Sequence, residues 1–275
     1  MIIWIASYPK SGNTWVRSFL SSYVYSKKSN FEFDDLKNIK TFPGNNEINF
    51  LRRKFGDYKF IDMASHWAVF QKKIIIDKKI NFLKTHNTLC TINGHDFANS
   101  SNSLGAIYII RDPRDIVVSY SHHLNLSYEE TFLRMIDSRA VEKTTDLKDR
   151  VLLGTWSNHY NAWKNFPIKK ILIKYEDLIN DAHLNFKRII YYLNKLYGLP
   201  IKEEGLAKSI ENVNFKNLKE LEKAEGFNEN PNIKLNKNFF RKGRVGEWKK
   251  VLSVDLVKKI EKEFKNEMIE NNYLS

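Results

Sequence analysis

Residues 2–15 decide the fold, and they read Ile2-Ile3-Trp4-Ile5-Ala6-Ser7-Tyr8-Pro9-Lys10-Ser11-Gly12-Asn13-Thr14-Trp15. The apolar run at residues 2–6 predicts a buried strand, and residues 14–25 predict the helix that follows it. The turn between them contains Lys10 and Gly12. A helix N-terminus offers unbonded backbone N–H groups and a partial positive charge. The stretch therefore predicts an anion-binding turn, with an ordinary turn capped by a serine as the simpler alternative.

The same alternation of strand and helix continues along the chain. Short apolar runs rich in Ile, Leu, Phe and Tyr predict buried strands at residues 81–85, 106–111 and 170–175. Helical patterns fall at residues 114–124, 128–136, 154–165, 178–197, 215–224 and 254–269. Alternating strands and helices are typical of parallel βαβ units. No repeat or change in composition divides the chain, so we expect an α/β fold: one three-layer domain over residues 1–275 with a central, mainly parallel sheet.

Composition limits the classes of function. The 275 residues include 45 Lys and Arg against 32 Asp and Glu, a formal net charge of +13, which favours an anionic partner. A bias toward Lys, Asn and Ile in the genome would also explain much of this excess. The apolar runs are shorter than the roughly 20 residues of a membrane span, and the first residues do not resemble a signal peptide, so we expect a cytoplasmic protein without a membrane anchor. Cys90 is the only cysteine, which excludes an intramolecular disulfide.

A second polar segment follows the predicted strand at residues 106–111. Arg111 stands where this strand ends, and Ser119 lies in the helix after it. Ligands of open α/β sheets bind at the carboxyl edge of the strands, where a guanidinium can hold a phosphate with two hydrogen bonds. Alternatively, Arg111 and Arg114 pair with Asp112 and Asp115 at the start of the helix.

A third segment precedes the last helix. Residues 238–249 place Arg241, Lys242 and Arg244 around Gly243. Such a cluster of charges is usually a solvated surface. Three cations within four positions beside a glycine also suit a clamp over a phosphate.

The candidate general base is His86, in Lys84-Thr85-His86 at the end of the strand at residues 81–85. A lone histidine at a strand end is usually structural. This one is expected at the same sheet edge as Lys10 and Arg111, and a neutral imidazole accepts protons near pH 7. The other candidates are His66, His95, His122, His123 and His159. Adjacent His122 and His123 point about 100° apart on a helix, and no His-Glu-x-x-His spacing exists, so we assign no metal.

The turn at residues 7–15 resembles the 5′-phosphosulfate loop of the cytosolic-type sulfotransferases, which use 3′-phosphoadenosine 5′-phosphosulfate (PAPS). It is not a Walker A motif, because Lys10 precedes Gly12. The order Arg-Lys-Gly, two residues, Gly, acidic residue, Trp-Lys at residues 241–249 is a second hallmark of that family. With Arg111 between them, the resemblance extends over nearly the whole chain and implies a P-loop-like loop in the α/β fold.

The resemblance implies a role for each matching residue. The 5′-phosphosulfate would be bound by Lys10, Ser11, Gly12, Asn13 and Thr14, where Asn13 replaces the usual second Thr. The 3′-phosphate would be bound by Arg111, Ser119, Arg241, Lys242 and Gly243. The adenine would contact Trp15, Tyr175 and Phe215. His86 would be the general base, and Lys10 would stabilise charge on the leaving phosphate without a metal.

Two alternatives and two questions stay open. Asp112 as a magnesium ligand would suit a P-loop-like kinase, and the net charge of +13 would suit a non-catalytic nucleic-acid binder. Our prediction is a sulfotransferase with a small-molecule or saccharide acceptor, set by loops at residues 42–59, 87–99 and 226–238, and with no nucleic-acid partner. The dimer motif of the family is degraded, and its oligomeric state is open; the motif's positions are Lys249, Ser253, Val254 and Lys258.

Overall fold

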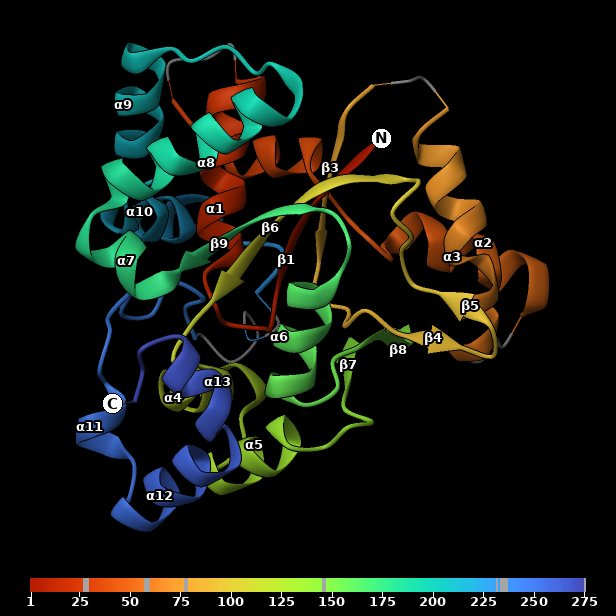
Figure 1. Cartoon of the computed structure of the whole chain (residues 1–275). Helices are drawn as coiled ribbons and strands as arrows, with labels where there is room; N and C mark the ends of the chain where they lie inside the picture. Colours follow the sequence, from red (N-terminus) through yellow and green to blue (C-terminus); the bar gives the residue numbers. More distant parts are fainter. Residues whose placement is uncertain are drawn as a thin grey trace.

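The computed structural model describes residues 1–26, 30–56, 60–76, 79–144, 147–230, 232 and 237–274. Its centre is a parallel sheet of five strands in the order β2-β3-β1-β6-β9 (Figure 1). The strands are β1 (Ile2–Ser7), β2 (Lys40–Thr41), β3 (Asn81–Thr85), β6 (Ser103–Ile110) and β9 (Lys169–Lys174). The predicted α/β class with a parallel sheet is confirmed.

Strand register brings the residues that follow β1, β3 and β6 to one edge of the sheet. Ala6 of β1 lies opposite Thr85 of β3 and Tyr108 of β6. The residues that follow each strand therefore leave the sheet at the same level, because parallel strands end on one side. Lys10, His86 and Arg111 all lie just beyond this carboxyl edge.

Helices cover both faces of the sheet, and successive residues of β1 alternate between them. Ile3 and Ile5 pack with residues of α1 (Asn13–Leu20) and α8 (Ala182–Tyr197). Trp4 and Ala6 pack on the opposite face with residues of α3 (Phe60–Ile74), α4 (Pro113–Leu124) and α6 (Trp156–Asn165). These two cores make the three layers visible in Figure 1. That they form a single domain stays a prediction.

The predicted strands agree with the observed ones to within three residues at each end. Among the helices, the one expected at residues 178–197 is interrupted at Asp181, which ends α7 (Tyr175–Asn180) and caps α8 by accepting from the Leu184 N–H at 2.8 Å. The helix expected at residues 254–269 likewise divides into α12 (Val254–Glu263) and α13 (Lys265–Glu270) at Phe264. The first helix ends at Leu20 and continues as a π-helix, Ser21–Tyr25.

The loop predicted at residues 42–59 is wrong over most of its length, because α2 (Asn45–Phe55) fills it; residues 57–59 lie outside the described part. Residues 87–99 contain a small hairpin of β4 (Thr91–Ile92) and β5 (His95–Asp96). A second hairpin pairs β7 (Val141–Thr144) with β8 (Leu147–Leu152). The remaining helices are a 3₁₀ turn at Phe33–Asn38, α5 (Tyr128–Met135), α9 (Glu203–Asn212), α10 (Phe215–Glu225) and α11 (Trp248–Val251).

No helix in the described part of the chain is both long enough and apolar enough to cross a membrane.

Candidate active site

The turn between β1 and α1 is held in an unusual backbone conformation. Lys10 has φ 66° and Gly12 has φ 99°, both in the left-handed region, and Gly12 is the N-cap of α1. Such a turn directs successive backbone N–H groups toward one side, which makes a concave site for an anion. A Cβ atom at Gly12 would lie 2.7 Å from the Tyr175 ring, so the ring packs directly on the turn because the side chain is absent.

Asn13 does not point its amide into this concave site. Its Nδ2 donates to the carbonyl oxygen of Ile5 at 3.1 Å and to Oγ of Ser7 at 3.2 Å. The side chain is buried and ties the start of α1 to the end of β1. A contact of the Asn13 amide with a donor phosphate, left open by the sequence, would require these bonds to break.

His86 lies across the sheet edge from the turn. Its Nδ1 is 2.7 Å from the carbonyl oxygen of Ser7, which can only accept, so Nδ1 carries the proton and Nε2 keeps its lone pair. Burial, with the nearby Lys84 ammonium as the next cause, lowers the pKa of His86 well below 6.5. A neutral imidazole whose free nitrogen is fixed by its neighbour is suited to accept a proton.

Buried His159 contacts the backbone of His86. Its Nε2 lies 3.1 Å from the backbone carbonyl of His86, and its Nδ1 lies 2.9 Å from the Tyr108 hydroxyl. Both ring nitrogens are therefore occupied, so His159 is a structural residue.

Lys10 faces cations and an aromatic ring. Its Nζ lies 4.0 Å from the centroid of the Phe239 ring. Burial and the neighbouring Arg111 guanidinium lower the pKa of Lys10 to about 7. An anion bound beside Lys10 would reverse this effect, because it would favour the charged ammonium.

Arg111 is positioned by the backbone and by a ring. Its guanidinium donates to the carbonyl oxygens of Lys10 and Arg244, each at 3.0 Å, and stacks 4.3 Å from the centroid of Tyr175. Arg111 therefore joins the first turn to the C-terminal loop.

Arg111 does not pair with Asp112 or Asp115, the carboxylates that follow it in the sequence. Asp112 instead forms an ion pair with Arg114, at 2.7 Å. Asp115 accepts from the backbone N–H groups of Gly246 and Trp248, at 2.6 and 3.1 Å. The carboxylates after β6 thus organise the C-terminal loop.

The loop at residues 241–247 contains its own counter-ion. Arg241 donates to both oxygens of Glu247, at 2.8 and 2.5 Å, and Lys242 donates to one of them at 2.5 Å. Hydrogen bonds from Arg241, and then from Lys242, lower the pKa of Glu247 to about 2 despite burial. Gly243 has φ 59°, and a Cβ there would lie 2.5 Å from the Phe215 ring. The charged residues of this loop are therefore held in place by one another, and the Phe215 ring packs against Gly243.

A cavity of about 1060 Å³ is lined by the turn after β1, by residues that follow β3 and β6, and by the loop at residues 241–247. All but one of the predicted site residues line it: Lys10, Gly12, Asn13, Thr14, Trp15, His86, Arg111, Ser119, Tyr175, Phe215, Arg241, Lys242 and Gly243. Ser11 does not, because it is fully buried beneath the turn. The structure therefore brings these residues together around one cavity, and their roles in binding and catalysis stay predictions.

The expected acceptor loops contribute unequally to this cavity. Residues 43–47 and 226–229 line it, whereas no residue of 87–99 does so in the part of the chain that the structure describes. That residues 87–99 help to set the acceptor stays a prediction, which the lining of this cavity does not support.

An ion cluster at the same cavity was missed by sequence reasoning. Glu229 accepts two hydrogen bonds from buried Arg17, at 3.0 and 2.9 Å, and lies 3.6 Å from Lys84. Burial opposes ionisation of Glu229, but Lys84 and Arg17 together lower its pKa to about 2. Arg17 is a charged residue within an amphipathic helix, which was the available signal of a buried ion pair. Its partner could not be predicted, because Glu229 lies 212 positions away in sequence.

His123 also lines the cavity, beside Lys10, so His86 is not the only histidine there. Burial, followed by Lys10, lowers the pKa of His123 to about 3. Among the described residues, no group of three or more His, Cys, Asp or Glu side chains is arranged to hold a metal ion.

Comparison with known proteins gives consistent matches over almost the full chain. A family model described as "Sulfotransferase domain" matches residues 2–272. Cytosolic sulfotransferase 16 of Arabidopsis thaliana is 27% identical, over 94% of this chain and 73% of that protein. Flavonol 4'-sulfotransferase of Flaveria chlorifolia is 24% identical, over 94% of this chain and 77% of that protein.

Solved structures share the fold. Mouse sulfotransferase SULT7A1 complexed with PAP (3′-phosphoadenosine 5′-phosphate) aligns with a TM-score of 0.63 at 19% identity, covering 97% of this chain and 84% of that one. Retinol dehydratase in a complex with retinol and PAP aligns with a TM-score of 0.61 at 19% identity, covering 97% and 81%.

Proposed function

This chain belongs to the sulfotransferase family, and from that membership we propose that it transfers a sulfuryl group from PAPS to an acceptor hydroxyl or amine. The observation that carries the proposal is one cavity to which four segments contribute: the turn after β1, the end of β3, Arg111 with Ser119 and His123 of α4, and the loop at residues 241–247. Each segment supplies side chains of the chemistry that the donor or the reaction requires.

The residues present fit such a donor. Trp15 Nε1 and Arg111 Nε belong to residues that line the cavity, are buried, and have no hydrogen-bond partner within the described chain. Buried donors without partners are costly, so a ligand with many acceptor oxygens would relieve them. At Gly12 and Gly243, aromatic rings pack where a side chain would stand, which brings Tyr175 and Phe215 directly against the two loops. Structures of fold relatives named with PAP support the same donor for this chain.

When bound, PAPS supplies an activated sulfuryl group on a 5′-phosphate. In our proposal the turn at residues 10–14 holds that phosphate with backbone N–H groups and the Lys10 ammonium. Arg111, Ser119, Arg241, Lys242 and the Gly243 backbone hold the 3′-phosphate, and Trp15, Tyr175 and Phe215 flank the adenine. Lys10 stabilises the negative charge that grows on the departing phosphate. It acts as a preorganised cation, which lowers the free energy of the transition state.

His86 takes the proton from the acceptor. The Ser7 carbonyl fixes the imidazole with the Nε2 lone pair free, and the low pKa of His86 keeps it neutral at pH 7. The Nε2 atom removes the acceptor proton as the hydroxyl oxygen attacks the sulfur in line with the leaving phosphate. The proton then resides on His86 until solvent removes it.

The names of the relatives also bear on the acceptor of the reaction and on the location of the protein in the cell. Relatives named for flavonols favour a small-molecule acceptor, and relatives named cytosolic favour a cytoplasmic protein. The kinase alternative loses its magnesium ligand, because Asp112 caps α4 and pairs with Arg114. The charge of +13 carries no separate argument for nucleic acid.

The test is transfer of radiolabelled sulfate from PAPS to a panel of phenols, alcohols, amines and saccharides, with formation of PAP measured in parallel. We expect a labelled product with at least one acceptor class and an equal amount of PAP. PAP released without any labelled product, or no binding of PAP by calorimetry, would contradict the proposal. The His86→Ala variant, prepared identically, is the control for contaminating activity.

A further inference from the structure

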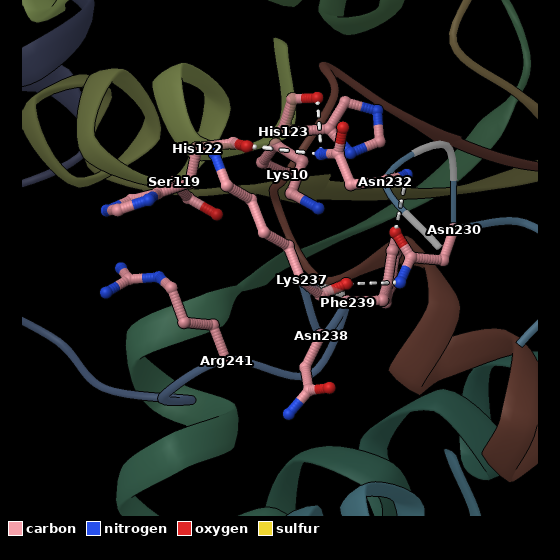
Figure 2. Close-up of a pocket in the computed structure, with 10 residues that line it drawn as sticks. All are labelled: Lys10, Ser119, His122, His123, Asn230, Asn232, Lys237, Asn238, Phe239 and Arg241. Carbon is pink, nitrogen blue, oxygen red and sulfur yellow. Dashed lines mark hydrogen bonds between the residues drawn. The ribbon is translucent and has the colours of Figure 1, made fainter. Parts of the chain in front are cut away.

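A second, smaller cavity of about 250 Å³ opens beside the first (Figure 2). The two cavities share Lys10, Ser119, His123, Phe239 and Arg241. We call the smaller one the side pocket; its further lining residues are His122, Asn230, Asn232, Lys237 and Asn238. Because Lys10 belongs to both, the side pocket begins at the proposed reacting centre. Its volume lies below the roughly 300 Å³ at which pockets for whole ligands begin, so it suits one substituent of a larger molecule.

The walls of the side pocket are built by hydrogen bonds between distant segments. Asn232 donates to the backbone carbonyls of His122 and His123, at 3.2 and 2.9 Å. Asn230 donates to the carbonyl of Lys237 at 2.7 Å, as Figure 2 shows. Asn232 is therefore tied to the end of α4, and Asn230 is tied to Lys237.

The charge of the side pocket is of one sign. Among the lining residues that the structure describes, none is Asp or Glu, whereas Lys10, Lys237 and Arg241 are present. Lys237 donates to the neutral Oδ1 of Asn125 at 2.7 Å, and Lys10 lies against the Phe239 ring. In the described part of the chain neither ammonium is paired with a carboxylate, unlike Arg17, Lys84, Arg241 and Lys242 elsewhere in the site. Lys10 and the exposed Lys237 thus line one pocket without a carboxylate partner, and such cations attract an anionic group.

His123 marks the junction of the two cavities. Its ring stacks on Tyr120 at 6.0 Å and meets the edge of Phe239 at 6.3 Å, so two aromatic neighbours hold its orientation. An acceptor that crosses this junction would pass His123 and Lys10 and reach Lys237 in the side pocket.

We propose that the acceptor carries an anionic substituent, a carboxylate, sulfate or phosphate on the same molecule as the reacting hydroxyl, and that the side pocket binds it through Lys237 and Lys10. This inference rests on the proposed function, because it assigns the acceptor of that reaction. The competing occupant is the 3′-phosphate of the donor, since Ser119 and Arg241 border both cavities.

The test compares 4-hydroxyphenylacetate with 4-hydroxyphenylacetamide, which share the reacting phenol and differ in charge. We expect kcat/KM for the acid to exceed that for the amide at least tenfold at low salt. Lys237→Met should lower this acid-to-amide ratio about tenfold. Lys208→Met removes the same charge from the exposed face of α9, away from both cavities, and should leave the ratio unchanged.

Two results would overturn the inference. A wild-type ratio near one, with both phenols sulfated, would exclude an anion pocket while leaving the sulfotransferase function intact. Calorimetry on protein saturated with PAP gives a readout that does not need turnover. Selective binding of the acid to this complex supports the inference even if neither phenol reacts, whereas equal binding of acid and amide would assign the side pocket to the donor. Absence of transfer to every acceptor contradicts the proposed function, not the pocket.

Discussion

The Nδ1 atom of His86 lies 2.7 Å from the carbonyl oxygen of Ser7, so the last residue of β1 selects the tautomer of a histidine that follows β3. The same carboxyl edge of the sheet places Lys10 three residues beyond Ser7. One backbone carbonyl therefore couples the proposed base to the turn that would hold the leaving phosphate.

Removal of this imidazole is expected to affect the chemical step and not donor binding. His86→Ala should lower kcat by about 10² to 10⁴, because general-base catalysis contributes on that scale, while the Kd for PAP changes little. The defect should be smaller for acidic phenols, which ionise without a base, than for alcohols. Steady-state kinetics and calorimetry measure the two effects, with His95→Ala on the exposed β5 hairpin as the control. Wild-type kcat on an alcohol whose chemical step limits the rate would exclude His86, and His123 would be tested next.

Lys10 is expected to act mainly in the transition state. Loss of a preorganised charge stabiliser costs about 10² to 10³ in kcat, so Lys10→Met should show a loss of that size. The value of kcat for Lys10→Met, measured at saturating PAPS, checks this. Full turnover in the variant would contradict the role, and abolition of wild-type activity by a chelator would point to a metal in its place.

The sequence was sufficient to predict the residues that follow the buried strands. Apolar runs fix β1, β3, β6 and β9, and parallel strands must bring their carboxyl ends together, so Lys10, His86 and Arg111 could be placed at one edge. The geometry of the C-terminal loop could not be derived in this way. Arg241 and Lys242 reach the cavity because Asp115 holds the backbone of Gly246 and Trp248, a contact over 131 residues or more that no local pattern records.

The sequence alone did not predict which polar residues are buried, or that a helix with few buried residues forms. Helix α2 was missed because its first turn, Asn45-Asn46-Glu47, looks like a polar loop, and only Ile48 and Leu51 are buried. Ser11 fits the family pattern, yet it lies under the turn and not in the cavity. Side-chain direction within a correctly predicted turn depends on tertiary packing, as the bonds of Asn13 to Ile5 and Ser7 demonstrate.

Stability is expected to fall between pH 7 and pH 5 because burial keeps several histidines, His86, His123 and His159, neutral in the folded chain. The folded chain keeps the buried imidazole of His159 neutral, with a pKa of about 3, whereas the unfolded chain binds a proton below about pH 6.5. The unfolded state therefore binds more protons, so the free energy of unfolding decreases as pH falls, by about 2 kcal/mol for this group by pH 5. Urea unfolding at the two pH values measures the change. His159→Gln should show a smaller difference; an equal difference would assign the effect to other groups.

Donor recognition should depend on the 3′-phosphate. Arg111, Ser119, Arg241 and Lys242 line one cavity, so PAP should stabilise the protein much more than adenosine 5′-phosphate at equal concentration. At 100 times its Kd a ligand adds about 2.7 kcal/mol to the free energy of unfolding. Thermal unfolding with each nucleotide measures the difference. Equal shifts would remove the basis for a 3′-phosphate site.

Glu247 is expected to oppose donor binding. Its carboxylate accepts three hydrogen bonds from Arg241 and Lys242, the cations proposed to hold the 3′-phosphate. A phosphate must compete with this carboxylate for the same donors and is repelled by its charge. Glu247→Gln keeps the size of the side chain but removes the charge, so PAP should bind about tenfold more tightly, or about 1.4 kcal/mol.

The loop should keep its position in this variant, because Asp115 still holds Gly246 and Trp248. Calorimetric titration with PAP measures the Kd, and Glu263→Gln, an exposed residue of α12, controls for the change in net charge. A weaker Kd in Glu247→Gln would mean that the carboxylate orients Arg241 and Lys242 for the phosphate and does not compete with it. The dependence of Kd on salt separates the effects further: competition predicts a steeper dependence in the variant, since the phosphate then meets two uncompensated cations.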